Sequence, residues 1–282
     1  MDNKNILITG GPGSLGRALT EYILENYKPE RIRILSRSEY NQYLMKTEID
    51  SDVVSYILGD IRDAERVDMA CRDVDIIINC AAMKRIESCQ RDPLECKKTN
   101  VDGVENLIQS AFKNKVSKVF QISTDKAVYA TTLYGKSKAM AEDLVMDANW
   151  YSTAKYPMFS CGRFGNFIGS TGSVIEIFKR QAKSGVLTVT HKDMVRYFID
   201  PETVAGFVCG CINKMEGGEI FIPKMPSQKV LELAEFICPE CEIKFTGTRE
   251  MEKIEEVLFS EEEKPIMEDK GEYYVIRPNQ VN

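Results

Sequence analysis

The chain has 282 residues, of which 43% are hydrophobic and 28% charged, and its formal net charge is −6 at pH 7. A chain of this length can bury a sizeable core, so we expect one large domain or one domain with a smaller lobe. The acidic balance leaves no broad basic face and disfavours nucleic-acid binding. No apolar run approaches the ~20 residues that span a bilayer. A strand begins by Asn5, which leaves no room for a signal peptide, so we expect a cytoplasmic protein without a membrane partner.

A glycine-rich turn, residues 9–16, follows the first apolar run, Ile6-Leu7-Ile8. A helical pattern with Leu15, Leu19 and Ile23 on one face comes directly after it. Strand, glycine turn and helix N-terminus together form a cradle for a pyrophosphate, because glycines allow close approach and the first helical N–H groups meet its charge. The alternative is a tight turn without a ligand. The residues expected to bind a dinucleotide here are Gly10, Gly13, Ser14, Leu15 and Gly16.

Apolar runs alternate with helical patterns over the first 166 residues. The expected strands are Ile6–Ile8, Ile32–Ser36, Val53–Leu58, Ile76–Ile78, Val119–Ile122 and Met158–Gly162. The expected helices run to about Asn26, over Ala64–Ala70, over Pro93–Lys113 and over Leu133–Ala148. This alternation predicts an α/β fold with a doubly wound parallel sheet of the Rossmann type.

The alternation loosens beyond Asn166. A strongly charged tail, Glu250–Lys264, predicts a solvated helix. We therefore expect a core over residues 1–166 and a small lobe over residues 167–282 that is interleaved with the last core elements. The other expected elements are helices over Val174–Lys183 and Pro201–Ile212 and strands over Val186–Val189 and Glu219–Ile222.

The nine cysteines are expected to be reduced and packed, because several lie in apolar runs. Cys238 and Cys241 have the spacing of half a zinc site or of a redox pair. The earlier Cys209 and Cys211 are two residues apart rather than three, which does not complete a zinc site. We expect no metal, with a helix end at Cys238 and a strand start at Cys241.

The residues after the second strand indicate which dinucleotide binds. An acidic residue there binds the ribose 2′-hydroxyl of NAD, whereas an arginine accommodates the 2′-phosphate of NADP. Here Ser36, Arg37 and Ser38 offer a guanidinium and two hydroxyls, so we expect NADP rather than NAD. The alternative is that Arg37 is a solvated loop residue. Further along, Asp60 and Ile61 are expected to flank the adenine, and Ala81 and Ala82 to lie behind the nicotinamide ribose.

A tyrosine and a lysine four residues apart, Tyr134 and Lys138, begin a predicted helix and lie on one face of it. A neighbouring ammonium and a positive nicotinamide are expected to lower the pKa of the phenol, so that Tyr134 can act as a base. Behind a strand that ends in Ser123-Thr124, in a chain that opens with the glycine turn, this pair resembles the extended short-chain dehydrogenase/reductase family.

The stretch Ser123-Thr124-Asp125-Lys126-Ala127, followed by Leu133-Tyr134-Gly135, narrows the resemblance. It is similar to the UDP-N-acetylglucosamine 4,6-dehydratases of the polysaccharide-biosynthesis group. The resemblance extends from Ile6 to about Glu256. Four further stretches carry it: Ala81–Lys84, Lys98–Val101, Arg163–Ile175 and Gly217–Lys224.

The resemblance implies a catalytic role for five residues. Tyr134, with Lys138, removes the proton of the sugar 4-hydroxyl while hydride leaves C4 for NADP+, and Thr124 hydrogen-bonds the 4-oxygen. Lys126 acts as the base at C5, for which it must be neutral. Asp125 acts as the acid for the departing 6-hydroxyl, for which burial must keep it protonated. The alternative for Asp125 and Lys126 is a surface turn with a local ion pair.

The resemblance also implies the substrate contacts. Met83 and Lys84 are expected near the sugar, Lys84 near the cofactor too, Asn166 at the diphosphate, and Arg196 and Arg249 along the nucleotide. The alternative for each arginine is a surface ion pair. The chain departs from the family's pattern at residues 191–196, where one arginine and one threonine are missing, and at residues 249–253, which lack a Pro-Gly turn. His191, the only histidine, is expected to be a loop residue.

The core is accordingly expected to bind NADP and carry the catalytic residues, and the lobe to bind a UDP-sugar. We also expect a homo-oligomer. Two alternatives stay open: a UDP-sugar 4-epimerase or 4-ketoreductase of the same fold, and a non-catalytic NADP-binding regulator. An intact Tyr134 resembles the branch of the family that inverts C5.

Overall fold

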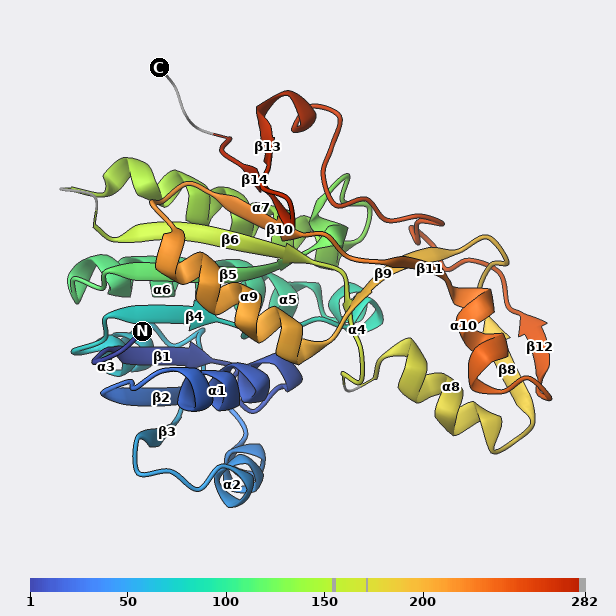
Figure 1. Ribbon diagram of the computed structural model, residues 1–282, viewed down its shortest axis with the longest axis horizontal. Helices are drawn as coiled ribbons and strands as arrows, with labels where there is room; N and C mark the ends of the chain where they lie inside the picture. The colour runs from blue at the N-terminus through green and yellow to red at the C-terminus, as the bar shows by residue number, and fades with distance from the viewer. Residues whose placement is uncertain (154–155, 171, 279–282) are drawn as a thin grey trace.

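A nine-stranded sheet forms the centre of the computed structural model, which describes residues 1–153, 156–170 and 172–278 (Figure 1). The strand order is β13-β14-β10-β6-β5-β4-β1-β2-β3. All neighbours from β3 to β10 are parallel, while β14 is antiparallel to both β10 and β13. This confirms the α/β fold with a doubly wound parallel sheet. The strands are β1 (Asn5–Thr9), β2 (Arg31–Ser36), β3 (Val54–Leu58), β4 (Ile76–Asn79), β5 (Lys118–Thr124), β6 (Met158–Phe164), β10 (Ile220–Pro223), β13 (Met267–Asp269) and β14 (Tyr273–Ile276).

The central strands are apolar because helices cover both faces of the sheet. Every residue of β4 is buried, and so are Ile6, Leu7 and Ile8 of β1. Helices α1 and α9 pack together on one face, while α3, α6 and α7 lie on the other (Figure 1). The helices around the sheet are α1 (Ser14–Asn26), α2 (Glu39–Glu48), α3 (Ala64–Cys71), α4 (Ile86–Arg91), α5 (Pro93–Lys97), α6 (Gly103–Lys113), α7 (Leu133–Asp147) and α9 (Pro201–Lys214). Short helical turns lie at η1 (Lys98–Asp102), η2 (Asp125–Ala127), η3 (Ala148–Tyr151) and η4 (Lys264–Ile266).

A smaller group of elements lies beyond the carboxyl ends of the central strands, at the right of Figure 1. It has its own apolar cluster around Phe178, Leu187 and Val230. The chain leaves the main sheet after β6, returns with α9 and β10, leaves again with β11, and returns with β13. The division at residue 166 stays a prediction. The elements of the group are β7 (Asn166–Phe167), α8 (Val174–Ala182), β8 (Val186–Val189), β9 (Val195–Ile199), β11 (Ser227–Lys229), α10 (Val230–Ile237) and β12 (Glu242–Phe245).

Two predicted helices differ from the structure. The helix expected over Pro93–Lys113 contains a π-helical turn at Lys98–Asp102, where Asn100 turns its side chain onto the backbone of Met83. The helix expected over Glu250–Lys264 is wrong, since this segment is irregular apart from η4. The backbone of this segment forms hydrogen bonds with other parts of the chain instead. For example, Val195 N donates to Ile254 O at 3.0 Å.

A buried arginine attaches the C-terminal segment to the core. Arg163 of β6 contacts Glu142 of α7 at 2.7 and 3.2 Å, and Glu263 at 2.9 and 3.0 Å. It also donates to Leu258 O at 2.9 Å. The side chains of Arg163 and Glu142 are 4% and 6% exposed. A buried ion pair of this kind joins the helix that begins with Tyr134 to the segment after residue 257.

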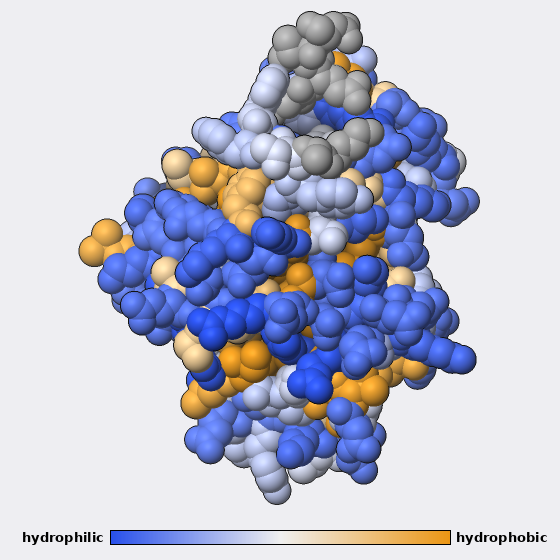
Figure 2. Space-filling model, turned by 90° about the vertical axis from the view of Figure 1, so that its left-hand side faces the viewer, coloured by the Kyte–Doolittle hydropathy of each residue, from blue (hydrophilic) through white to orange (hydrophobic). Residues whose placement is uncertain are grey.

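The face at the amino ends of the strands is predominantly hydrophilic, with hydrophobic residues in separate small groups (Figure 2). Within the described ranges, none of the helices is both long and apolar enough to cross a membrane.

Cys238 and Cys241 correct the expectation that all cysteines are reduced. The two form a disulfide, because the end of α10 and the turn before β12 bring their Cα atoms to 5.3 Å. The expected helix end and strand start are close to those observed, at Ile237 and Glu242. The other seven cysteines are free.

Replacing Arg163 by leucine is predicted to lower the free energy of unfolding by about 3–5 kcal/mol, because the carboxylate of Glu142 is left buried without a partner. Urea unfolding measures the change. Lys113→Ala, which removes an exposed ion pair with Asp68, is the matched control and should cost under about 1 kcal/mol. An equal, small effect of both substitutions would contradict the role of Arg163.

Alkylation of the thiols tests the cysteine assignment. Unfolded protein without reductant is predicted to take up seven alkyl groups, and nine after reduction, by intact mass. In the native protein, burial raises the pKa of Cys71 and of Cys80 to about 12. A raised pKa means less thiolate at pH 8, so native labelling should be slow and should rise about tenfold per pH unit below pH 12. Nine groups without reductant would show that no disulfide is present.

Candidate active site

The candidate site lies where the carboxyl ends of β1, β4 and β5 meet. Strand β1 has β2 on one side and β4 on the other. The chain therefore continues from β1 toward β2 and β3 and then crosses back to β4 on the opposite side, which makes the carboxyl end of β1 a topological switch point. Ligands of open parallel sheets bind in the crevice at such a switch point. The described residues contain no group of three or more His, Cys, Asp or Glu side chains arranged to hold a metal.

The glycine turn fits a pyrophosphate. Gly10 has a φ of +66°, and a Cβ there would lie 2.8 Å from the backbone N of Ala81. At Gly16 a Cβ would overlap the backbone of Gly11. Helix α1 begins at Ser14 and Leu15, with Gly13 as its N-cap and no side chain capping its first N–H groups. Those N–H groups are therefore available to an anion.

The segment after β2 has the composition expected at the far end of a dinucleotide. Ser36 Oγ accepts a hydrogen bond from Gln42 at 3.0 Å, and Ser38 Oγ caps α2. Both hydroxyls can still donate to a phosphate. The guanidinium of Arg37 is 54% exposed and lies 3.7 Å from Asp60, so it is free enough to turn toward a ligand.

Behind the glycine turn, Ala81 and Ala82 are half-buried and follow the end of β4. Ala81 N donates to side-chain oxygens of Thr9 and Asn79. Ile61, expected at the adenine, is 4% exposed, and it lies against Gly103 of α6, where a Cβ would come within 2.7 Å of it.

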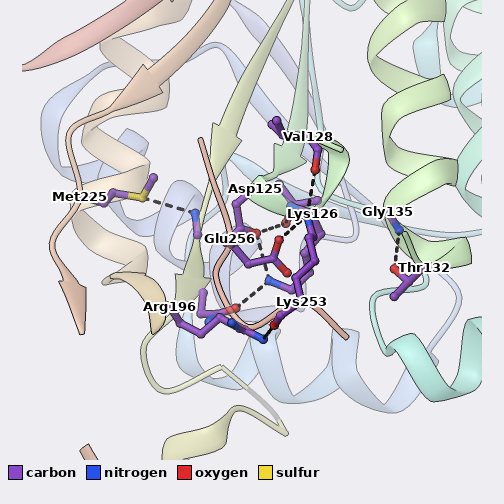
Figure 3. Close-up of polar contacts among 12 residues, drawn as sticks. Asp125, Lys126, Val128, Thr132, Gly135, Arg196, Met225, Lys253 and Glu256 are labelled. Carbon is purple, nitrogen blue, oxygen red and sulfur yellow. Dashed lines mark hydrogen bonds and ion pairs between the residues drawn. The ribbon is translucent and has the colours of Figure 1, made fainter. Parts of the chain in front are cut away.

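Thr124, Asp125 and Lys126 lie together at the end of β5. Figure 3 shows Asp125 next to Lys126. Lys126 Nζ lies 3.0 Å from Asp125 Oδ1 and donates to Asn166 Oδ1 at 3.1 Å. Thr124 Oγ1 donates to the same carboxylate oxygen at 2.9 Å. Asp125 has no exposed surface, and within the described part of the chain its Oδ2 has no hydrogen-bond partner. The carboxylate of Asp125 is therefore buried and the side chain of Lys126 is 15% exposed, so the pair is not the surface turn considered above.

Tyr134 and Lys138 lie one turn apart on α7 and are 9% and 4% exposed. Burial raises the pKa of Tyr134 well above its usual range, the charge of Asp125 raises it further, and a hydrogen bond with Thr124 lowers it. Burial also lowers the pKa of Lys138, whose Nζ donates to Ile122 O at 2.6 Å. Without a nucleotide, burial and the charge of Asp125 thus determine the pKa of Tyr134, and the ammonium of Lys138 is directed at a backbone carbonyl. The lowering expected beside a positive nicotinamide stays a prediction.

The residues expected near the sugar flank this group. Asn100 holds Met83 through both backbone polar groups, at 2.8 and 2.9 Å. Lys84 is exposed next to it. Asn166, expected at a diphosphate, has its amide oxygen bonded to Lys126 instead.

The two arginines expected along the nucleotide have different surroundings. Arg196 is 7% exposed and donates to the backbone oxygens of Val195, Lys253 and Ile254 at 2.7–2.9 Å. It therefore holds the segment 253–254 in place, and its ion pair with Glu252, 3.8 Å away, is largely buried rather than on the surface. Its role along the nucleotide stays a prediction. Arg249 is exposed and lies 3.1 Å from Glu87, as a surface ion pair. His191 is in an exposed loop, where Nδ1 accepts from Asp193 N.

Sequence reasoning missed a charged pair, Lys253 and Glu256, beside Lys126 (Figure 3). Lys253 Nζ lies 2.5 Å from Glu256 Oε2 and donates to Val128 O at 2.8 Å. No sequence pattern marks these residues, because the charged stretch that contains them predicts a solvated helix. They line a cavity of about 50 Å³ together with Lys126, Thr131, Thr132 and Arg196. A larger groove of about 390 Å³ between α3 and α6 involves none of the site residues.

Known proteins resemble this chain over nearly its whole length. The chain is 41% identical to a UDP-N-acetylglucosamine 4,6-dehydratase (inverting) of Campylobacter jejuni over 280 residues, which covers 99% of this chain and 84% of that protein. It is 36% identical to a UDP-glucose 4-epimerase of Rickettsia canadensis over 282 residues, 97% of this chain and 83% of that protein. The X-ray structure of Pen from Bacillus thuringiensis is similar with a TM-score of 0.93 and 34% identity, over 98% of this chain and 89% of that one.

A family model described as polysaccharide biosynthesis protein matches residues 6–278. The match includes the glycine turn, the buried Asp125–Lys126 pair and the Tyr134–Lys138 pair. The chain therefore belongs to the polysaccharide biosynthesis protein family.

Proposed function

We propose that the protein removes water from UDP-N-acetylglucosamine, or a close UDP-N-acetylhexosamine, to form a UDP-4-keto-6-deoxy sugar for cell-surface polysaccharide or glycan biosynthesis. The observation that carries this proposal is the buried Asp125–Lys126 pair, 3.0 Å apart, at the strand end next to Thr124. Elimination needs an acid and a base at neighbouring carbons, and this pair offers both. The 41% identity to a dehydratase of that name supports the substrate.

NADP+ is the proposed cofactor, and when bound it stores the hydride between its removal from C4 and its delivery to C6. The glycine turn and the N-terminus of α1 hold its pyrophosphate, and the segment after β2 holds its 2′-phosphate. The residues proposed to contact it are Gly10, Gly13, Ser14, Leu15, Gly16, Ser36, Arg37, Ser38, Asp60, Ile61, Ala81, Ala82, Lys84, Tyr134 and Lys138.

Tyr134 takes the proton of the 4-hydroxyl, and Thr124 donates a hydrogen bond to the 4-oxygen. Since burial and Asp125 raise the pKa of Tyr134, the phenol stays protonated at neutral pH until positive charge lies beside it. Lys138 is close enough on α7 to supply part of that charge. This requirement delays formation of the base until the positively charged nicotinamide is in place.

The Asp125–Lys126 contact allows the acid and the base of the elimination to be restored by one proton transfer. Neutral Lys126 takes the C5 proton, and the C6–O bond breaks as protonated Asp125 gives its proton to the departing hydroxyl, which leaves as water. An ammonium and a carboxylate remain, 3.0 Å apart. Transfer of one proton across that contact restores both groups without solvent. Water supplies the proton that returns to C5 from the opposite face, as inversion at C5 requires, and Tyr134 releases the proton of the 4-hydroxyl to water, so that the protein ends the cycle unchanged.

The substrate contacts are proposed from the residues around the pair. Met83 and Lys84 lie toward the sugar, Asn166 orients Lys126, and Arg249 exchanges Glu87 for the diphosphate. The core of residues 1–166 then supplies the chemistry and residues 167–282 the substrate lobe. A cytoplasmic location and a homo-oligomer stay predictions.

A 4-epimerase is the second candidate, because relatives at 36% identity carry that name. Epimerisation at C4 needs Tyr134 and Lys138 but has no leaving group at C6. The buried Asp125–Lys126 pair is unexplained by that reaction, so the dehydratase is the better assignment. A non-catalytic regulator is disfavoured by the intact Tyr134 and Lys138.

Incubation of the purified protein with UDP-N-acetylglucosamine is predicted to give a product lighter by one water in mass spectrometry. Lys126→Ala is expected to abolish the loss of water while NADP+ binding, measured by calorimetry, stays intact. Lys136→Ala, an exposed lysine on the same helix as Tyr134, is the matched control with normal turnover. A product of unchanged mass would point to epimerisation. NMR of the product formed in deuterated water reports deuterium and configuration at C5.

Arg37→Ala is predicted to weaken NADP+ binding about 10- to 100-fold, because a charge-assisted contact with the 2′-phosphate is lost. NAD+ binding should change little, since it has no 2′-phosphate. Calorimetry with both nucleotides measures the preference, and Arg31→Ala, an exposed arginine at the start of β2, serves as the control. Equal losses for both nucleotides would show that Arg37 does not read the 2′-phosphate.

A further inference from the structure

Three polar side chains form a buried chain across neighbouring strands of the apolar sheet. Thr9 ends β1, Asn79 ends β4, and Gln121 lies in β5. None of them is more than 1% exposed. We call Thr9, Asn79 and Gln121 the strand-end polar chain. Polar residues in the middle of such a sheet are costly unless every group is bonded, so their bonding partners deserve a full account.

The backbone of Ala81 determines how the two amides are oriented. Ala81 N can only donate, and it lies 3.2 Å from Asn79 Oδ1, which also accepts from Thr9 Oγ1. The oxygen of the Asn79 amide is thus assigned, and its Nδ2 donates to Gln121 Oε1 at 2.7 Å. Gln121 Nε2 must then be a donor, and it donates to Ile122 O at 2.7 Å. Asn79 therefore donates to Gln121, and Gln121 donates to Ile122 O, so both hydrogen bonds have the same direction.

The strand-end polar chain ends at Ile122 O, the carbonyl oxygen that also accepts a hydrogen bond from Lys138. Ile122 O accepts from Gln121 Nε2 at 2.7 Å and from Lys138 Nζ at 2.6 Å. Pairing of β5 with β4 ends at Asn79 and Gln121, one residue before Ile122. The two side-chain donors thus lie where β4 no longer pairs with β5. A carbonyl oxygen has two lone pairs, so Gln121 leaves Lys138 only one of them.

We propose that Asn79 and Gln121 are positioning residues that fix the ammonium of Lys138 relative to Ala81. The catalytic consequence rests on the proposed function, in which Lys138 supports Tyr134 and Ala81 lies behind the nicotinamide ribose. Without the amide of Gln121, Lys138 can bond either lone pair of Ile122 O, and its Nζ becomes less well defined. A displacement of about 1 Å in an active site can cost up to about 100-fold in rate.

Cohesion of the sheet alone would not need this arrangement. Strands β1, β4 and β5 are already paired through their backbones up to Asn79 and Gln121. Apolar side chains would fill the same space without any demand for partners. The polar chain instead links the backbone amide beside the glycine turn to the catalytic lysine, two groups that must act on one nucleotide.

Gln121→Met is the main test, because it nearly keeps the side-chain volume and removes both the donor and the acceptor of the amide. We expect kcat for dehydration to fall about tenfold or more with KM changed less than about twofold, since positioning acts on the reacting step. A crystal structure of the variant without nucleotide is expected to show Lys138 Nζ displaced from Ile122 O or divided between two positions. Asn79→Leu, which removes the hydrogen bond from Asn79 to Gln121, is the second variant if Gln121→Met is too unstable to purify.

Ser160→Ala is the matched control. It removes another fully buried hydrogen bond in the sheet, 2.6 Å long, between Ser160 of β6 and Glu219. This variant should lose thermal stability and keep its kcat and its pH profile. Normal kcat in Gln121→Met, or an unmoved Lys138 in its crystal structure, would overturn the proposal and leave a purely structural role. If the wild-type protein fails to dehydrate the sugar, the proposed function fails, while the crystal structures still test the position of Lys138.

Discussion

The burial of Asp125 is the constraint on which the arrangement of the site depends. A carboxyl group with no exposed surface must have hydrogen-bond donors or a positive charge beside it, and it has Thr124 and Lys126 on one oxygen. Lys126 in turn is held by Asn166, which the chain brings in only after β6 has ended. Among the residues that the structure describes, the second oxygen of Asp125 has no hydrogen-bond partner, and the proposed reaction uses this free oxygen.

Buried charged groups also determine the course of the C-terminal segment. Residues 250–256 look like a solvated helix in sequence, yet they cross the site in an irregular conformation. Arg196 satisfies two of their backbone carbonyls, and Lys253 and Glu256 compensate one another next to Lys126. Arg163 fixes the following residues to α7. Buried charges, rather than regular secondary structure, therefore hold this segment against α7 and the end of β5.

Much of the core could be predicted because its signals are local. The Ile6–Ile8 and Ile76–Ile78 runs are strands for the reason expected, since helices cover both faces of the sheet. The glycine turn follows from backbone geometry, as the positive φ of Gly10 shows. Strands β9, β13 and β14, helices α2 and α4 and the π-helical turn were not predicted. The strands pair with segments distant in sequence, as β9 does with β11 and β14 does with β10, and the side chain of Asn100 in the π-helical turn bonds the backbone of Met83.

The sequence by itself determined the order of the core strands and helices, the cradle at Gly10–Gly16 and the proximity of Asp125, Lys126, Tyr134 and Lys138 to one strand end. All of these depend on residues within a few positions of one another. Only the tertiary structure decided that Arg196 holds a backbone segment, that Lys138 points at Ile122 O, and that the pKa of Tyr134 is raised. Burial and long-range hydrogen bonding decide these properties, and neither is encoded in a local pattern.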